Sequence, residues 1–176
     1  MEGVGKSRYR TTWWRVLEIA ILLSALAGAL HLRLRVVLPA YVGSRSMEPT
    51  LRVGDYVLIN RRAYQHRLPA LGDIIALNTL DREEVWLKRV VAGPGDVIEL
   101  RGGVLYRNGQ ACHEPYIQEV GHYSFPRYRV PRNHVFVLGD NRDRSEDSRV
   151  WGPLRRDYIV GRVFFVYWPC ARMRRT

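Results

Sequence analysis

Lysine is almost absent from this 176-residue chain. Of its 28 basic residues only Lys6 and Lys88 are lysines, and all the others are arginines. Arginine keeps its proton in proteins, whereas a desolvated lysine amine can release its proton and act as a base. A lysine that acts as a base is therefore restricted to two positions.

Cysteine is scarce, and histidine occurs in no catalytic pattern. The two cysteines, Cys112 and Cys170, are too few to define a disulfide scaffold, and neither lies in a recognisable cysteine-protease motif. Their spacing is compatible with one bridge or with two free thiols, and we expect free thiols. None of the five histidines, at positions 31, 66, 113, 122 and 134, belongs to a histidine-triad motif. We therefore predict neither a thiol nucleophile nor a histidine base.

Nucleic-acid and metal-binding signatures are also missing. The net charge of +11 raises both nucleic acid and anionic lipid as partners, but the basic residues are scattered and form no recognition helix or stripe. The acidic stretch from Asp140 to Asp147 lacks the glycine and the terminal glutamate of a calcium-binding EF-hand loop. We expect no nucleic-acid partner, no metal and no organic cofactor.

The one long apolar run lies near the N-terminus, from Val16 to Leu32. As a helix, residues 11–32 span about 33 Å, close to the roughly 30 Å of a bilayer core. Basic residues precede the run, and Trp13 and Trp14 suit the membrane interface. These features predict a cytoplasmic N-terminus (residues 1–12) and a transmembrane anchor (residues 13–32). A cleavable signal peptide ending near Ala27-Gly28-Ala29 is the alternative interpretation.

The rest of the chain, residues 33–176, has the pattern of a β-rich domain. Short apolar or alternating runs bounded by glycine, proline and asparagine predict strands. Gly102-Gly103 and Asn108-Gly109 predict tight hairpin turns. Few segments show a helical period, so the fold class is mainly β and antiparallel. The predicted strands cover residues 34–42, 53–60, 73–77, 85–92, 97–100, 104–106, 134–138 and 158–167.

Ser46 is the best candidate for a nucleophile. It follows a predicted strand and precedes Met47-Glu48-Pro49, where an exposed loop is expected. A serine hydroxyl needs a general base to take its proton. Lys88 follows the apolar residues Val85-Trp86-Leu87, where desolvation can lower its pKa from ~10.4 toward ~7–8. The other interpretation is that Lys88 faces solvent on its strand.

Three segments resemble the motifs of type I signal peptidases. They occur in the family's order, and the resemblance extends from about Leu30 to Tyr167. It implies a serine protease with a Ser/Lys dyad on a barrel-like β-sheet domain behind an uncleaved anchor. The segments are Ser44-Arg45-Ser46-Met47-Glu48-Pro49-Thr50-Leu51, Trp86-Leu87-Lys88-Arg89-Val90-Val91 and Gly139-Asp140-Asn141-Arg142-Asp143-Arg144-Ser145-Glu146-Asp147-Ser148-Arg149.

The resemblance also implies a role for each site residue. Ser46 would be the nucleophile, Lys88 its base, and Ser44 an oxyanion donor. Supporting roles fall to three residues of the third motif: Ser145, which would orient the lysine amine, and the ion pair of Asp147 with Arg149. The chain departs from the family pattern at Gly43, where proline is usual, and at Arg144, where asparagine is usual.

A nucleophile this close to an anchor can reach only peptide bonds near the bilayer surface. Secretory precursors present such bonds after their apolar segment, with small residues at the first and third positions before the cut. We expect an extended substrate beside residues 34–42 and 85–87, with Val42, Met47 and Leu87 as pocket walls. The alternative is that these three residues belong to the core.

The sequence therefore predicts a membrane-bound enzyme that removes signal peptides from secretory precursors. It would be a single-pass protein with a cytoplasmic N-terminus and a peptidase domain on the outer face of the membrane. Three alternatives remain open: a self-cleaving Ser/Lys regulator, a catalytically inactive membrane-tethered binding protein and a basic nucleic-acid-binding module.

Overall fold

The computed structural model describes residues 5–79, 84–118 and 121–176, with the side chains of residues 5–12 and 32–35 left aside. The chain divides into two compact units, one ending at Val37 and the other running from Leu38 to Thr176. Each unit is described separately below.

The first unit is a single helix, α1 (Gly5–Arg35). Its stretch Trp13–His31 has a mean hydropathy of 1.6, and none of it is buried. Length and composition make this stretch able to cross a membrane. The helix extends beyond the predicted anchor, so the strand predicted from Leu34 was wrong at its start. Leucine and arginine are good helix formers, and no glycine or proline lies between Leu32 and Pro39.

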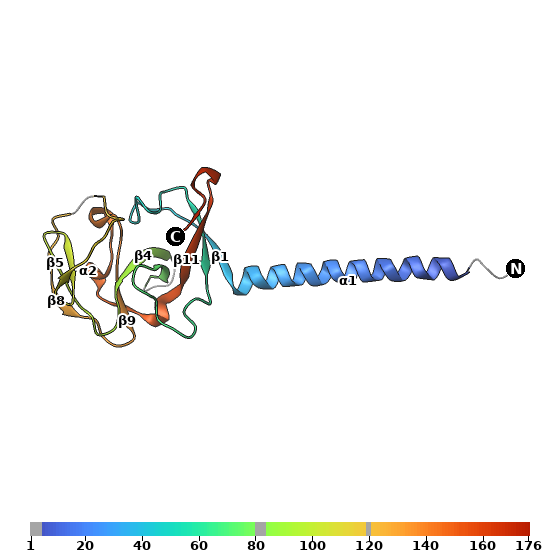
Figure 1. The fold of residues 1–176 in the computed structure, drawn as a ribbon, viewed down its shortest axis with the longest axis horizontal. Helices are drawn as coiled ribbons and strands as arrows, with labels where there is room; N and C mark the ends of the chain where they lie inside the picture. The colour runs from blue at the N-terminus through green and yellow to red at the C-terminus, as the bar shows by residue number, and fades with distance from the viewer. Residues whose placement is uncertain (1–4, 80–83, 119–120) are drawn as a thin grey trace. The chain divides into compact units, whose positions relative to one another are not determined.

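The second unit contains two β-sheets (Figure 1). The larger sheet has the strand order β1-β2-β11-β3-β4-β9-β10, with β12 paired to β11. Its strands are β1 (Val37–Tyr41), β2 (Tyr56–Asn60), β3 (Ile74–Asn78), β4 (Val85–Ala92), β9 (His134–Leu138), β10 (Leu154–Arg155), β11 (Ile159–Trp168) and β12 (Arg174–Arg175). From β2 to β10 neighbouring strands pair antiparallel.

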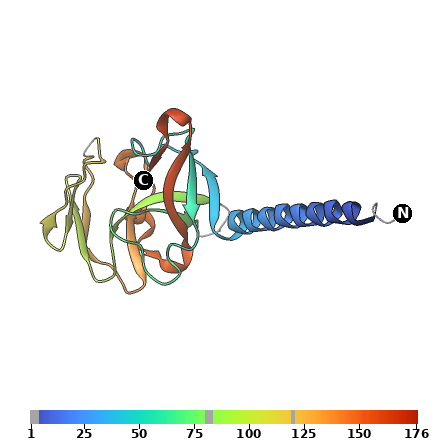
Figure 2. The same cartoon turned by 45° about the vertical axis from the view of Figure 1, so that its right-hand side comes forward.

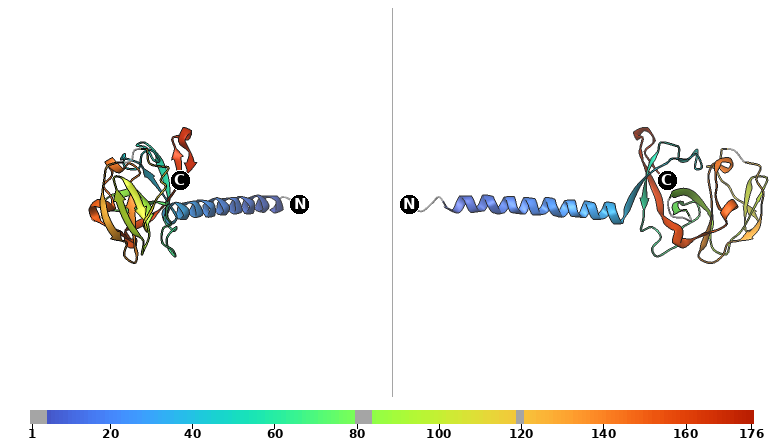
Figure 3. Two further views of the ribbon diagram at one scale, coloured as in Figure 1. Left: turned by 60° about the vertical axis from the view of Figure 1, so that its left-hand side comes forward. Right: turned by 180° about the vertical axis from the view of Figure 1, so that it is seen from behind.

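The smaller sheet has the order β7-β6-β5-β8 and is also antiparallel. It is built from β5 (Val97–Arg101), β6 (Val104–Arg107), β7 (Gln110–Ala111) and β8 (Phe125–Arg129). Figures 2 and 3 show that its strands lie together at one end of the second unit, whereas the chain's C-terminus lies beside the larger sheet.

Most of the predicted strands are present, which confirms the mainly β fold class. Both predicted hairpin turns are confirmed too, because Gly102, Gly103, Asn108 and Gly109 all have positive φ. Four short strands, β7, β8, β10 and β12, were not predicted. β8 contains a proline and two arginines and is mostly exposed, so it carries no apolar run from which a strand is recognised.

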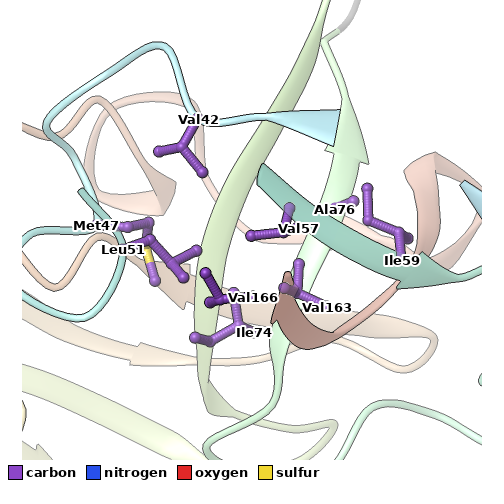
Figure 4. Close-up of a cluster of buried hydrophobic side chains, with 9 residues drawn as sticks. All are labelled: Val42, Met47, Leu51, Val57, Ile59, Ile74, Ala76, Val163 and Val166. Carbon is purple, nitrogen blue, oxygen red and sulfur yellow. The ribbon is translucent and has the colours of Figure 1, made fainter. Parts of the chain in front are cut away.

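The largest side-chain cluster attaches a loop to the larger sheet (Figure 4). Val42, Met47 and Leu51 come from the loop after β1, and the remaining buried members come from strands β2, β3 and β11. Burying each such side chain is worth roughly 1.5–3 kcal/mol. This packing fixes both ends of the segment that carries Ser46.

Short α- and 3₁₀-helices complete the fold. They are η1 (Arg142–Arg144), α2 (Ser148–Trp151), η2 (Arg156–Tyr158) and η3 (Cys170–Arg172). The first two lie in the segment between β9 and β10, which contains the third motif.

Candidate active site

Ser46 lies in a turn that is held from two sides. The Met47 carbonyl accepts the Leu51 amide at 2.8 Å, which closes the turn beyond the serine. The Ser46 carbonyl accepts the backbone N–H of Asn141 at 3.0 Å, so the third motif binds the first directly. Ser46 is 6% exposed, and its own N–H donates to no acceptor among the described residues. This N–H is therefore free to bind a substrate oxygen.

Lys88 lies on β4 and is buried, with 4% of its surface exposed. Side chains alternate along a strand, so Lys88 and Arg89 point to opposite faces of the sheet. Burial lowers the pKa of Lys88 to about 8, while the nearby carboxylates of Asp147 and Glu146 act in the opposite direction. The solvent-facing alternative for Lys88 is thus wrong, and burial brings the pKa of its amine well below that of an exposed lysine.

Ser46 and Lys88 line the same cleft, which has a volume of about 590 Å³. Ser44 lines it as well, and its hydroxyl lies 3.2 Å from that of Ser46. No hydrogen bond joins Ser46 Oγ to Lys88 Nζ in the described part of the chain. The Lys88 amine lies 5.4 Å from the centre of the Trp86 ring. Catalytic hydrogen bonds are often long in free enzymes and tighten when substrate binds.

The three predicted pocket residues also line this cleft. Val42 and Met47 are at the same time fully packed members of the hydrophobic core, and Leu87 packs against that core. The core interpretation is confirmed, and the floor of the cleft is the outer layer of that core. Substrate binding by these residues stays a prediction.

Two free strand edges border the cleft. β1 is the terminal strand of its sheet, and residues 85–88 of β4 pair with β3 but with no other described strand. Tyr41 lies at the first edge, and Val85 to Lys88 form the second. Unpaired backbone groups on such edges are able to bind an extended peptide.

The loop between β9 and α2 is braced by a buried ion pair. Arg149 donates to the Asp147 carboxylate at 2.8 Å, and the side chains are 9% and 0% exposed. Asp147 also accepts the Gly139 amide at 3.0 Å, and Arg149 binds the carbonyls of Arg142 and Ser145. The pair expected from the sequence is present, and it closes the loop from inside.

Ser145 does not make the contact expected of it. Its hydroxyl is buried and has no hydrogen-bond partner among the described residues, so the predicted bond to the Lys88 amine is not formed. Leaving a buried hydroxyl without a hydrogen bond costs about 1–3 kcal/mol of folding stability. A donor or acceptor that comes within hydrogen-bond distance of Ser145 would recover this energy.

Two further ion pairs brace the site and were missed by the sequence analysis. Arg89 forms a two-point contact with Asp140, at 2.8 and 2.7 Å, and thereby joins β4 to the third motif. Arg142 binds Glu114, which lies between β7 and β8, at a distance of 2.6 Å. These partners lie 51 and 28 residues apart in the chain, and nothing in the spacing of charges indicates such contacts.

Other candidate chemistry is not supported by the described residues. Cys112 and Cys170 are both free thiols, as expected, and burial raises the pKa of the Cys112 thiol. Within residues 5–79, 84–118 and 121–176, no group of three or more histidine, cysteine or acidic side chains is arranged to hold a metal ion.

Comparison with known proteins identifies the family. Residues 13–168 match the family described as signal peptidase, peptidase S26. The chain belongs to this family. The match includes the apolar stretch of α1 and all three motifs, so this signal peptidase resembles its family over that stretch as well as the β unit.

Three relatives illustrate the similarity of this signal peptidase to others. "Probable signal peptidase I-1" of Synechocystis is 40% identical over 90% of this chain and 86% of its own. "Signal peptidase IB" of Staphylococcus aureus is 31% identical over 79% of this chain and 82% of its own. "Thylakoidal processing peptidase 1, chloroplastic" of Arabidopsis thaliana is 38% identical over 78% of this chain and 44% of its own.

Proposed function

We propose that this chain is a membrane-bound serine endopeptidase that removes signal peptides from precursor proteins, with Ser46 as nucleophile and Lys88 as general base. The observation that supports it most is that a serine hydroxyl and a desolvated lysine amine lie in one cleft. Membership of the signal peptidase family supports the substrate class.

The first chemical step forms an acyl-enzyme. Ser46 Oγ attacks the carbonyl carbon of the scissile bond while the neutral Lys88 amine accepts its proton. The developing oxyanion accepts hydrogen bonds from the Ser46 N–H and the Ser44 hydroxyl. Each preorganised donor is worth about 3–4 kcal/mol in the transition state. The Lys88 ammonium then gives its proton to the leaving amine as the C–N bond breaks.

The second step releases the signal peptide. Water attacks the ester, Lys88 takes one proton from the water, and that proton returns to Ser46 Oγ as the C–O bond to the enzyme breaks. Lys88 is thus base and acid in turn, and no cofactor is required. For either step the Lys88 amine must move from the Trp86 ring to within hydrogen-bond distance of Ser46.

The substrate would bind as an added strand between the two free sheet edges. Its backbone pairs with β1 or with residues 85–88, and its small side chains enter shallow pockets at Val42, Met47 and Leu87. The shallow floor follows from the core packing beneath it, which leaves little space for a large side chain.

The proposed topology is single-pass. Residues 1–12 would be cytoplasmic, residues 13–32 would span the bilayer, and residues 33–176 would form the peptidase domain on the outer face. The exposed apolar surface of α1 and the basic residues before it support this arrangement. Its partners would be phospholipid and secretory precursors.

Labelling with an acylating probe tests the nucleophile. We expect an activated ester of a peptide ending in alanine to add one acyl group to the full chain in detergent, and none to Ser46→Ala. Ser124→Ala is the matched control, because Ser124 is exposed and does not line the cleft, and it should be labelled normally. Intact mass is the readout. Equal labelling of Ser46→Ala would exclude Ser46, and an unlabelled wild type would favour an inactive binding protein.

The pH dependence of cleavage follows from the lowered pKa of Lys88. Because only the neutral amine accepts a proton, kcat/KM should rise with pH up to about 8 and level off above it. Glu146 raises the pKa of Lys88, so Glu146→Gln should move this limb to lower pH. Initial rates on a model precursor between pH 5 and pH 10 measure both. A limb that stays in place in Glu146→Gln would contradict the assignment of the limb to Lys88.

A further inference from the structure

A second cleft opens beside Ser46 and is entirely polar. It has a volume of about 510 Å³, and every residue that lines it is charged or carries a side-chain amide. One wall of the cleft is the loop between β1 and β2 that carries Ser46, which we call the nucleophile loop; it contributes Arg45 and Glu48. The other wall is the third motif, from Asp140 to Arg144. No apolar residue among those described contributes to its wall.

This polar cleft continues the first cleft at the nucleophile. Arg144 lines both clefts, and Arg45 precedes Ser46 directly. The hydrogen bond from Asn141 N–H to the Ser46 carbonyl joins the two walls at this point. A peptide that is cut at Ser46 has to extend to both sides of the serine, so the two clefts together provide a path for the chain before and after the scissile bond.

The character of the clefts indicates the direction of the peptide. The first cleft contains the apolar residues Val42, Met47 and Leu87, which suit small side chains before the cut. The polar cleft offers only hydrogen-bonding and charged groups. It therefore suits the residues after the cut. These residues form the start of the released protein, and their side chains need not be apolar.

Only two of the six charged residues of the polar cleft form ion pairs with other described residues. Asp140 and Arg142 are taken up by ion pairs with Arg89 and Glu114. The other four charged residues form no ion pair within the described chain: Arg45, Glu48, Asp143 and Arg144.

The four unpaired charges differ in how close they lie to the scissile bond. Arg144 lies at the junction of the clefts, and Arg45 is covalently next to Ser46, whereas Glu48 and Asp143 line the polar cleft alone. Glu146 lines the first cleft. Of the four unpaired charges of the polar cleft, the two arginines are thus the ones next to Ser46 or at the junction of the clefts.

We propose that the polar cleft binds the first residues after the scissile bond, and that Arg45 and Arg144 make it select acidic over basic side chains there. This inference rests on the proposed function and adds a specificity-determining pair to it. An ion pair at an exposed site contributes modestly, so a several-fold preference is expected.

Two model precursors that differ only after the cut test the proposal. One carries aspartate and the other lysine at the first two positions of the released chain. Wild type should cleave the aspartate precursor several-fold faster, as kcat/KM. Arg144→Glu should lower the aspartate-to-lysine ratio by about tenfold and reverse the preference, whereas Arg144→Lys should retain it. The ratio cancels any general loss of activity in a variant.

Arg132→Glu is the matched control, because Arg132 is exposed, lines neither cleft and undergoes the same change of charge. Its ratio should equal that of wild type. A ratio that is unchanged in both Arg144→Glu and Arg45→Glu, or that falls equally in Arg132→Glu, overturns the polar-cleft proposal while leaving the proposed function intact. Cleavage of neither precursor by wild type overturns the proposed function instead, and the subsite with it.

Discussion

Replacing Lys88 by alanine should reduce the kcat of precursor cleavage by about 10⁴-fold or more, since Lys88 is the only amine that lines the cleft among the described residues. Ser46→Ala should cause a loss of similar size, and the double variant should be no worse than either single one, because the two residues act as a unit. Cleavage of a model precursor in detergent, followed by gel densitometry over long incubations, measures the effect.

The conservative change Lys88→Arg gives the sharper test. It keeps the positive charge and much of the side-chain length, but a guanidinium does not release its proton, so this variant should be as inactive as Lys88→Ala. Lys6→Ala removes the other lysine of the chain and should keep full activity. Thermal melting should confirm that all variants fold. Appreciable cleavage by Lys88→Arg would show that Lys88 acts through its charge and not as a base.

Gly139→Ala should lower kcat by about 10²-fold, although Gly139 touches no substrate in the proposed mechanism. A Cβ atom at this position would lie 2.5 Å from the Ser46 carbonyl oxygen and would also clash with the Ser145 side chain. The carbonyl oxygen cannot retreat freely, because it is hydrogen-bonded to the Asn141 amide. The nucleophile must therefore shift, and displacements of about 1 Å can cost 10²-fold in rate.

Gly43→Ala is the matched control for this prediction. Gly43 also lines the active cleft, but a Cβ there meets only the Tyr41 ring, at 3.6 Å, which is ordinary contact. Its activity should stay within a few-fold of wild type. Folding is followed by thermal melting, since overpacking typically costs 1–3 kcal/mol. If folded Gly139→Ala cleaves as fast as Gly43→Ala, the close approach of the third motif does not position Ser46.

Local patterns in the sequence were sufficient for most of the fold. Alternating and apolar runs predicted the central strands, and residue pairs that tolerate positive φ, such as Asn108-Gly109, predicted the hairpins. These features depend on neighbours a few residues apart. The short strands β10 and β12 were beyond such reasoning, because two residues are too few to show an alternating pattern. The end of α1 was missed because the apolar residues after Leu32 suit a helix as well as a strand.

The candidate site shows the same division. The near absence of lysine, together with the three motifs, was enough to select Ser46 and Lys88 from the sequence. It was not enough to find the ion pairs of Arg89 with Asp140 and of Glu114 with Arg142, or the unsatisfied hydroxyl of Ser145. Those contacts join segments that nothing in the spacing of residues brings together.

Residue chemistry by itself therefore determined which groups are candidates for the reaction: one serine after a strand, and the only lysine of the β unit. Tertiary structure decided that the amine is buried, that burial lowers its pKa to about 8, and that hydroxyl and amine line one cleft. The physical reason is that desolvation and proximity are properties of packing. They arise only when β4, the nucleophile loop and the third motif are folded against one another.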